Sequence, residues 1–195
     1  EADRVACERR LAAMFADHIV GVGDTSLQRR VVELLAAAGR RIATAESCTG
    51  GLIAALLTEV PGASQVFDAG FVSYSNAIKE RVLGVEAATL AAHGAVSEAV
   101  VLQMARGALA RSGADYAVAV SGIAGPDGGT PDKPVGTVWV AWGGADRLRA
   151  RELYFPLARK LFQTMVAATA LDLLRRELLG IEAEPRYFRD RAPPR

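Results

Sequence analysis

The length and composition of the chain indicate one globular domain. It has 195 residues, of which 51% are hydrophobic and 23% charged, and its net charge is +1 at pH 7. A chain of this length supports one full-sized hydrophobic core rather than two. The near-neutral charge argues against a nucleic-acid partner, and no apolar stretch reaches the roughly 18 residues that cross a bilayer.

Cysteine content and the N-terminus bear on where the protein works. The two cysteines, Cys7 and Cys48, lie far apart and form no CxxC pair, so neither a disulfide framework nor a zinc site is expected. The first twenty residues mix charges of both signs, which does not fit a signal peptide. We therefore expect a soluble, cytoplasmic protein with no metal, no membrane partner and no nucleic-acid partner.

Two helices are predicted at the start of the chain. Apolar residues recur at helical spacing over residues 5–19. Ser26 then begins a second helix that runs to about Ala38. Glycines separate the two helices, so residues 1–24 are predicted to form an N-terminal helical extension.

Strands and helices alternate in the remainder of the chain. Strands are predicted at 41–45, 66–74, 115–120, 135–142 and 148–155, and helices at 48–58, 76–83, 86–93, 97–112 and 159–179. This order, which ends in a hairpin, predicts an α/β fold: a three-layer α/β/α single domain with a mixed central sheet, over residues 25–180. Residues 181–195 are charged and contain proline, and are predicted to be a loose tail.

The first polar cluster, TAESCTGG, covers residues 44–51 at a strand-to-helix junction. Ser47 or Thr49 can cap the helix through its hydroxyl group. Alternatively, Ser47 is a nucleophile beside backbone N–H groups that have no partner within the helix and that would stabilise an oxyanion. The glycine pair would let a substrate approach the backbone. Both interpretations stay open, and Glu46 has no assigned role.

The second polar cluster is SYSNAIKERV, residues 73–82. Lys79 lies four residues after Ser75, so the two share one face of the predicted helix. A lysine beside a serine can act as its base if burial lowers the pKa of the lysine. Alternatively, Ser75 or Asn76 caps the helix and Lys79 is a solvated surface charge.

The third polar cluster is the loop SGIAGPDGGTPDKP, residues 121–134. It follows an apolar strand, where α/β sheets bind ligands, and its glycines offer N–H groups for an anion. It matches neither a Walker A loop nor GxGxxG. The alternative is a long surface turn, although structureless loops of this length are uncommon in compact domains.

A thiol nucleophile is the remaining chemical alternative. Cys48 could serve only if His93 or His18 reached it, and nothing in the sequence indicates such a pair. Cys48 is also typical of a small apolar filler, and His93, which precedes a glycine, is typical of a helix end.

Four stretches together resemble one known family. TAESCTGGLIAALLTEVPGAS, GFVSYSNAIKERVLGV, HGAVSEAV and DYAVAVSGIAGPDGGTPDKPVGTVWVA are similar to the C-terminal domain of the competence/damage-inducible protein CinA. Within that family they resemble most the stand-alone nicotinamide-nucleotide amidases (nicotinamide mononucleotide deamidases, PncC). The resemblance covers about residues 31–179.

The resemblance implies an activity. It is hydrolysis of the carboxamide of nicotinamide mononucleotide to nicotinate mononucleotide and ammonia, as part of pyridine-nucleotide recycling. No metal or organic cofactor is implied, and a homodimer of the single-domain form is expected.

The resemblance also implies roles for individual residues. Ser47 would be the nucleophile, Lys79 its general base, and Tyr74 a group that orients the lysine or relays a proton. The implied substrate-binding residues are Thr49, Gly50 and Gly51 at the oxyanion, Asn76 at the carboxamide or ribose, and Ser121, Gly122, Ala124, Gly125 and Arg159 elsewhere on the nucleotide.

One position departs from the family pattern. The family usually carries Arg-x-x-x-Arg at the start of its last helix, whereas this chain has Arg159 and Gln163. The Gly-Asp pair that usually precedes the helix is Leu157-Ala158 here. If the arginine pair binds phosphate or bridges subunits, this chain binds substrate more weakly or differently. The alternative function is therefore a catalytically silent nucleotide-binding or interaction module of the same family.

Overall fold

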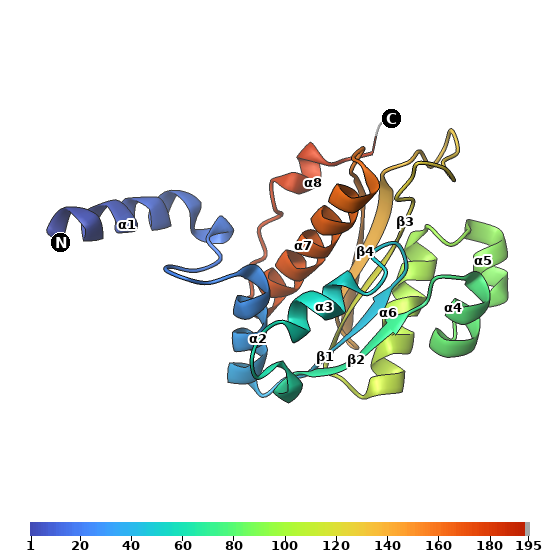
Figure 1. The fold of residues 1–195 in the computed structure, drawn as a ribbon, viewed down its shortest axis with the longest axis horizontal. Helices are drawn as coiled ribbons and strands as arrows, with labels where there is room; N and C mark the ends of the chain where they lie inside the picture. Colours follow the sequence, from blue (N-terminus) through green and yellow to red (C-terminus); the bar gives the residue numbers. More distant parts are fainter. Residues whose placement is uncertain (194–195) are drawn as a thin grey trace.

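A five-stranded mixed sheet lies at the centre of the fold (Figure 1). The structure is a computed structural model that describes residues 1–193. The strands, in the spatial order β2-β1-β3-β4-β5, are β1 (Ile42–Glu46), β2 (Phe67–Val72), β3 (Tyr116–Gly122), β4 (Thr137–Gly144) and β5 (Arg147–Tyr154). The α-helices are α1 (Ala2–Phe15), α2 (Leu27–Ala38), α3 (Leu52–Thr58), α4 (Asn76–Leu83), α5 (Ala87–His93), α6 (Glu98–Ser112), α7 (Arg159–Leu178) and α8 (Tyr187–Asp190).

The strand directions indicate which edge of the sheet could bind a ligand. β1 pairs in parallel with β2 on one side and with β3 on the other, whereas β4 and β5 form an antiparallel hairpin. All five residues of β1 are buried, as expected of a central parallel strand covered on both faces. The chain runs from β1 out to β2 and then returns past β1 to β3, so the direction of strand addition reverses beside β1. In open α/β sheets, ligands bind at such a switch point, at the carboxyl ends of the strands.

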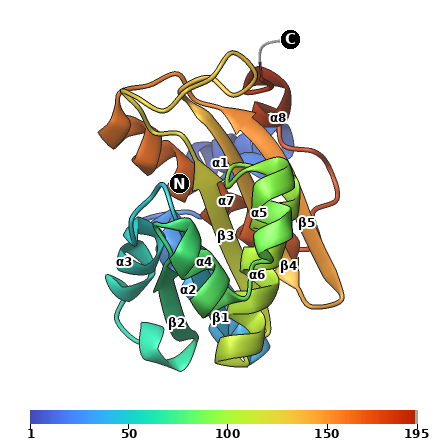
Figure 2. The same cartoon turned by 90° about the vertical axis from the view of Figure 1, so that its right-hand side faces the viewer.

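Helices cover both faces of the sheet, which confirms the predicted three-layer α/β/α domain (Figures 1 and 2). One core cluster joins α2, α3 and α7 to the sheet, and the other joins α4, α5 and α6. Gly107 of α6 lies against the last residue of α4, and a Cβ at this position would overlap the carbonyl oxygen of Leu83. A glycine is therefore required for α4 to lie this close to α6.

The N-terminal helix lies apart from the sheet (Figure 1). None of the residues of α1 is buried, and Leu11, Met14 and Phe15 are exposed. The segment that follows α1 is held more firmly, because the buried guanidinium groups of Arg175 and Arg176 donate to the carbonyl oxygen of Asp17 over 2.9 and 2.8 Å. The extension is thus helical and is attached to α7 at its base.

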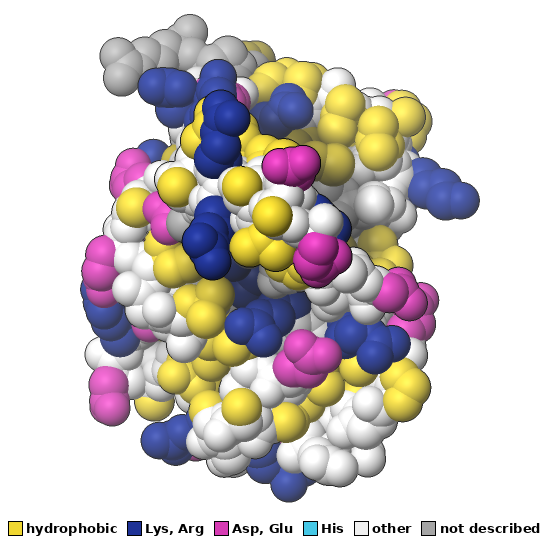
Figure 3. Space-filling view, turned by 90° about the vertical axis from the view of Figure 1, so that its left-hand side faces the viewer, with side chains coloured by type: hydrophobic (Ala, Val, Ile, Leu, Met, Phe, Trp, Pro, Cys, Tyr) yellow, Lys and Arg dark blue, Asp and Glu magenta, His cyan; other side chains and the backbone are white. Residues whose placement is uncertain are grey.

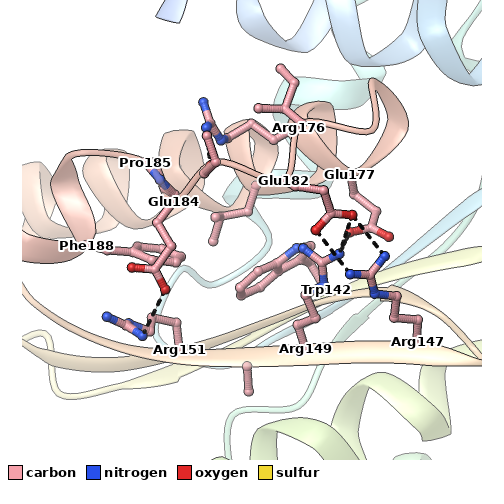
Figure 4. Close-up of a pocket in the computed structure, with 14 residues that line it drawn as sticks. Trp142, Arg147, Arg149, Arg151, Arg176, Glu177, Glu182, Glu184, Pro185 and Phe188 are labelled. Carbon is pink, nitrogen blue, oxygen red and sulfur yellow. Dashed lines mark hydrogen bonds and ion pairs between the residues drawn. The ribbon is translucent and has the colours of Figure 1, made fainter. Parts of the chain in front are cut away.

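The prediction of a loose C-terminal tail is wrong for much of its length. Phe188 of α8 is buried and packs against Trp142 of β4. Glu182 and Glu184 point towards arginines of β5, as Figure 4 shows, at 3.2 Å from Arg147 and 3.7 Å from Arg151. Contacts with distant parts of the chain order this segment. The last two residues of the predicted tail, 194 and 195, lie outside the described residues.

The face of the molecule in Figure 3 carries no large patch of one charge. On the face in Figure 3, basic and acidic side chains are interspersed with hydrophobic ones. Within residues 1–193, no helix has the length and hydropathy needed to cross a membrane.

Candidate active site

A cavity of about 220 Å³ opens at the carboxyl ends of β1, β2 and β3. Eight of the twelve residues predicted for the site line it. The lining residues are Ser47, Cys48, Tyr74, Asn76, Lys79, Ala95, Val96, Ser121, Gly122, Ala124 and Arg159. The three polar clusters of the sequence therefore meet at one place, although they are separated by about 30 to 45 residues along the chain.

Lys79 and Ser47 form the centre of the cavity. The Nζ atom of Lys79 donates to the Oγ atom of Ser47 over 3.0 Å. It also donates to two backbone carbonyl oxygens at the end of β2, those of Ser73 at 2.8 Å and Tyr74 at 3.3 Å. Lys79 is only 1% exposed, so it is not the solvated surface charge that the alternative interpretation of its helix required.

Burial lowers the pKa of Lys79 from its ordinary value of 10.5. Desolvation is the main cause, because it penalises the charged ammonium form. Within residues 1–193, no carboxylate forms an ion pair with Lys79, so nothing of that kind offsets the loss of solvation. A buried lysine with a lowered pKa and a serine hydroxyl within hydrogen-bonding distance has the arrangement of a base and its nucleophile.

Ser75 has the capping role that one interpretation of the second cluster predicted, whereas the role of Tyr74 differs from the one expected. Ser75 is the N-cap of α4, because its Oγ atom accepts from the N–H of Ile78. Tyr74 contacts Lys79 through its backbone carbonyl, whereas its hydroxyl accepts from Nη2 of Arg159 over 2.8 Å. The Tyr74 side chain is 62% exposed, so a proton relay through its phenol is not supported.

Glu46 supplies the N-terminal cap of α3. Its buried carboxylate accepts from the N–H groups of Gly51 and Ile53 at 3.0 Å and of Ala54 at 2.9 Å. It also accepts from the hydroxyl of Thr49 over 2.6 Å. These are the donors that the first turn of a helix leaves unpaired, and a negative charge there also interacts favourably with the helix dipole.

This cap corrects the predicted start of the helix and the predicted oxyanion donors. The helix begins at Leu52 rather than at Cys48. The N–H of Gly51 is bound by Glu46, and the N–H of Gly50 donates to the carbonyl of Ser47 over 3.2 Å. Neither glycine lines the cavity.

The glycine pair instead serves the backbone. Gly50 and Gly51 have φ values of +65° and +99°, so the chain turns through two consecutive residues in the left-handed region. Only glycine adopts this conformation readily. The pair is therefore explained by the conformation of the turn rather than by close approach of a substrate.

Cys48 lacks the properties of a nucleophile. The residue is buried, and burial raises the pKa of its thiol to about 12. The thiolate is the reactive form of cysteine, so a raised pKa disfavours thiol chemistry. His93 does not line the cavity, and its carbonyl oxygen accepts from Nζ of Lys133.

The opposite wall of the cavity is built by the loop after β3 and by the start of α7. The Oγ atom of Ser121 donates to the carbonyl of Ala95 over 2.7 Å, which joins the end of β3 to the segment before α6. Arg159, the first residue of α7, donates through Nη1 to the carbonyl of Gly125 over 2.9 Å. Its guanidinium group thus lies at the rim of the cavity, where an anionic part of a ligand would meet a positive charge.

Several residues at the site have positions or contacts that were not predicted from the sequence. Ala95 and Val96 line the cavity, and Glu46 and Gln163 hold the turn that carries Ser47. The stretch HGAVSEAV contributed to the family resemblance, which was the only signal for Ala95 and Val96. A glutamate next to a candidate nucleophile was a signal for Glu46.

Comparison with solved structures identifies close structural relatives. The CinA superfamily protein KP700603 from Klebsiella pneumoniae superposes with a TM-score of 0.77 at 41% identity, over 79% of this chain and 96% of that chain. The competence/damage inducible protein from Agrobacterium tumefaciens has a TM-score of 0.74 at 47% identity, over 76% of this chain and 91% of that chain.

Sequence comparison agrees with the structural one. A CinA-like protein of Colwellia psychrerythraea is 48% identical over 186 residues, which are 94% of this chain and 43% of the relative. A CinA-like protein of Akkermansia muciniphila is 52% identical over 167 residues, which are 84% of this chain and 40% of the relative. The chain thus spans about two fifths of the length of these relatives. Residues 24–178 match the family described as the CinA C-terminal domain, and the chain belongs to that family.

Proposed function

We propose that this domain is an amidohydrolase that deamidates nicotinamide mononucleotide to nicotinate mononucleotide and ammonia by a serine–lysine mechanism. The observation that carries the proposal is the pair of Ser47 and Lys79, joined over 3.0 Å at the carboxyl ends of the parallel strands. Hydrolysis of an unactivated amide needs a nucleophile, a base and a proton donor for the leaving group. The pair can supply all three.

The surroundings of Lys79 give its amine a direction. Two N–H bonds of a neutral amine are accounted for by the carbonyls of Ser73 and Tyr74. The remaining tetrahedral position, which carries the lone pair, then faces Ser47. The neutral amine can therefore accept the hydroxyl proton of Ser47 without moving.

The reaction then proceeds in two halves. Ser47 Oγ attacks the carboxamide carbon while its proton passes to Nζ of Lys79, and the carbonyl oxygen becomes an oxyanion. Collapse of the tetrahedral intermediate breaks the carbon–nitrogen bond, and the ammonium of Lys79 returns the proton to the departing NH₂ group, which leaves as ammonia. Water next attacks the ester on Ser47, again with Lys79 as the base, and releases the carboxylate product and the free serine.

The shape and charge of the cavity favour a substrate with a small buried head and an anionic tail. A volume of about 220 Å³ lies below the roughly 300–1,000 Å³ of pockets that enclose a whole drug-sized ligand. We therefore assign the nicotinamide ring to the interior and the phosphate to the rim beside Arg159. Ser121 and Asn76 also line the cavity and would contact the ribose or the carboxamide.

Ammonia release is the direct test of this function. We expect ammonia from nicotinamide mononucleotide and much less from free nicotinamide, because free nicotinamide lacks the phosphate that Arg159 would bind. The measurement is a coupled ammonia assay, with product identified by mass spectrometry. Calorimetric binding of the mononucleotide without turnover would contradict the proposal and favour a silent binding module.

The role of Lys79 as base predicts a specific pH dependence. The deprotonated amine is the active form, and burial lowers its pKa from 10.5, so the competent fraction rises with pH through a pKa below that value. We expect kcat/KM to rise with pH along a limb whose midpoint lies below pH 10.5. The measurement is a pH–rate profile from which the background rate of the Ser47→Ala variant is subtracted at each pH. A rising limb centred at or above 10.5 would count against a buried lysine base.

A further inference from the structure

Gln163 binds the backbone of the turn that carries Ser47. It lies one helical turn after Arg159 on α7, and its Nε2 atom donates to the carbonyl oxygen of Cys48 over 2.8 Å. This contact joins residues 115 positions apart in the sequence. It also falls at the position where the sequence departs from the usual arginine of the family pattern.

Two carbonyl contacts orient two consecutive peptide planes. The carbonyl of Ser47 is held by the N–H of Gly50, and the carbonyl of Cys48 is held by Gln163. A trans peptide is planar, and its N–H points opposite to its C=O. The N–H groups of Cys48 and Thr49 are therefore directed away from these two contacts.

Neither of these N–H groups donates to an acceptor on another residue within the part of the chain that the structure describes, and the N–H of Cys48 faces only its own thiol. Cys48 and Thr49 are nevertheless only 5% and 4% exposed. Buried backbone N–H groups without a partner are rare, and each calls for an explanation. A pair of them beside a nucleophilic serine has the chemistry of an oxyanion hole, in which the residue after the nucleophile commonly donates.

We propose that Gln163 is a positioning residue that orients the Cys48–Thr49 peptide, so that the N–H of Thr49 joins the N–H of Cys48 in stabilising the oxyanion. The proposal rests on the proposed function, because an oxyanion forms only during acyl transfer. It replaces Gly50 and Gly51 as donors with the two N–H groups that have no acceptor on another residue. It also explains the neutral glutamine at this position. The side-chain amide can donate to a carbonyl oxygen as an arginine would, but it carries no charge.

The experiment compares Gln163→Leu, which removes the donor, with Gln163→Arg, which keeps one. Thr164→Ala is the matched control on the next residue of α7, where the hydroxyl contacts only its own helix. We measure kcat and KM for nicotinamide mononucleotide, and the rate at which a fluorophosphonate labels Ser47. Thermal unfolding of each variant reports on folding.

In Gln163→Leu we expect kcat and the labelling rate to fall about 10- to 100-fold, with KM changed less than about threefold, because a misplaced oxyanion donor affects the transition state. Gln163→Arg should retain most of the rate, and Thr164→Ala all of it. Labelling of Gln163→Leu at the wild-type rate would overturn the inference. So would equal losses in Gln163→Leu and Gln163→Arg.

Failure of the proposed function would look different. If the wild-type protein does not deamidate the mononucleotide but Ser47 is labelled, the labelling rates alone decide the inference. If the protein shows neither reaction, hydrogen exchange decides it without any ligand. The amide of Gly50, which closes the turn, should exchange at least about tenfold faster in Gln163→Leu than in Thr164→Ala if Gln163 holds the turn. Equal exchange rates would overturn the inference.

Discussion

Replacing Lys79 by methionine is expected to lower kcat for the mononucleotide by a factor of about 10² to 10⁴, the usual contribution of a general base. The reason is that Nζ of Lys79 lies 3.0 Å from Oγ of Ser47, so its loss leaves the serine without a base. Methionine fills a volume similar to that of lysine, so the loss would not come from a cavity. The measurement is the steady-state rate of ammonia release.

The serine variant and the double variant test whether the two residues act as a unit. Ser47→Ala should cost at least as much as Lys79→Met, and the double variant should be no worse than the poorer single one. Independent losses that add would contradict a shared proton-transfer step. The Ser75→Ala variant is a useful control, because the Ser75 hydroxyl caps the same helix and is not a partner of the Lys79 amine.

The Lys79→Met substitution should also change how the free energy of unfolding depends on pH. In the wild-type protein the folded-state pKa of Lys79 lies below the unfolded-state value, so the unfolded chain binds the proton more readily. Wild-type stability therefore falls as pH decreases from 10.5 towards the lowered pKa. Lys79→Met removes this loss, so its stability relative to wild type should grow as pH falls through the same window.

Replacing Glu46 by alanine is expected to destabilise the fold by about 3–5 kcal/mol, the range found when one partner of a buried charged network is removed. The carboxylate accepts three backbone N–H groups and the hydroxyl of Thr49, and all of these donors would be left unpaired. Guanidinium-induced unfolding measures the effect. Activity should fall as well, because the turn that carries Ser47 begins at Glu46.

Glu59→Ala is the matched control for this experiment. Glu59 follows the other end of α3 and is exposed, so its replacement should change stability by no more than about 0.5 kcal/mol. The free energy of unfolding of Glu46→Gln should lie between those of the two variants. The amide oxygen accepts hydrogen bonds from some of the donors, while the NH₂ group faces the others. Equal stability of Glu46→Ala and Glu59→Ala would show that the carboxylate is not the cap of α3.

The sequence predicted the layers of the fold better than the details of its site. Strand and helix periodicity depends only on neighbours two to four residues away, and the α/β/α order followed from it. The cap of α3 did not, because Glu46 reaches donors five to eight residues ahead from within a strand. Capping rules that look for Ser, Thr, Asp or Asn just before a helix do not find such a residue.

The burial of charged side chains also could not be predicted from periodicity. Lys79 lies on a short helix whose sequence also suits the surface, and only the packing of α4 against α6 and the contacts of its amine with Ser47 and Ser73 place it inside. The contact between Gln163 and Cys48 crosses 115 residues and has no local signature. The order of the C-terminal segment likewise depends on Phe188 meeting Trp142 of the sheet.

The close approach of α4 and α6 at Gly107 has a consequence for how this protein can change. A methyl group there would push the end of α4 away, and Lys79 lies one helical turn from that end. A residue that never meets a substrate thus restricts which sequences can place the base beside its nucleophile. Mutational scans that score turnover should find this helix-to-helix contact as intolerant as the cavity itself, and engineering of substrate range is best confined to the opposite wall.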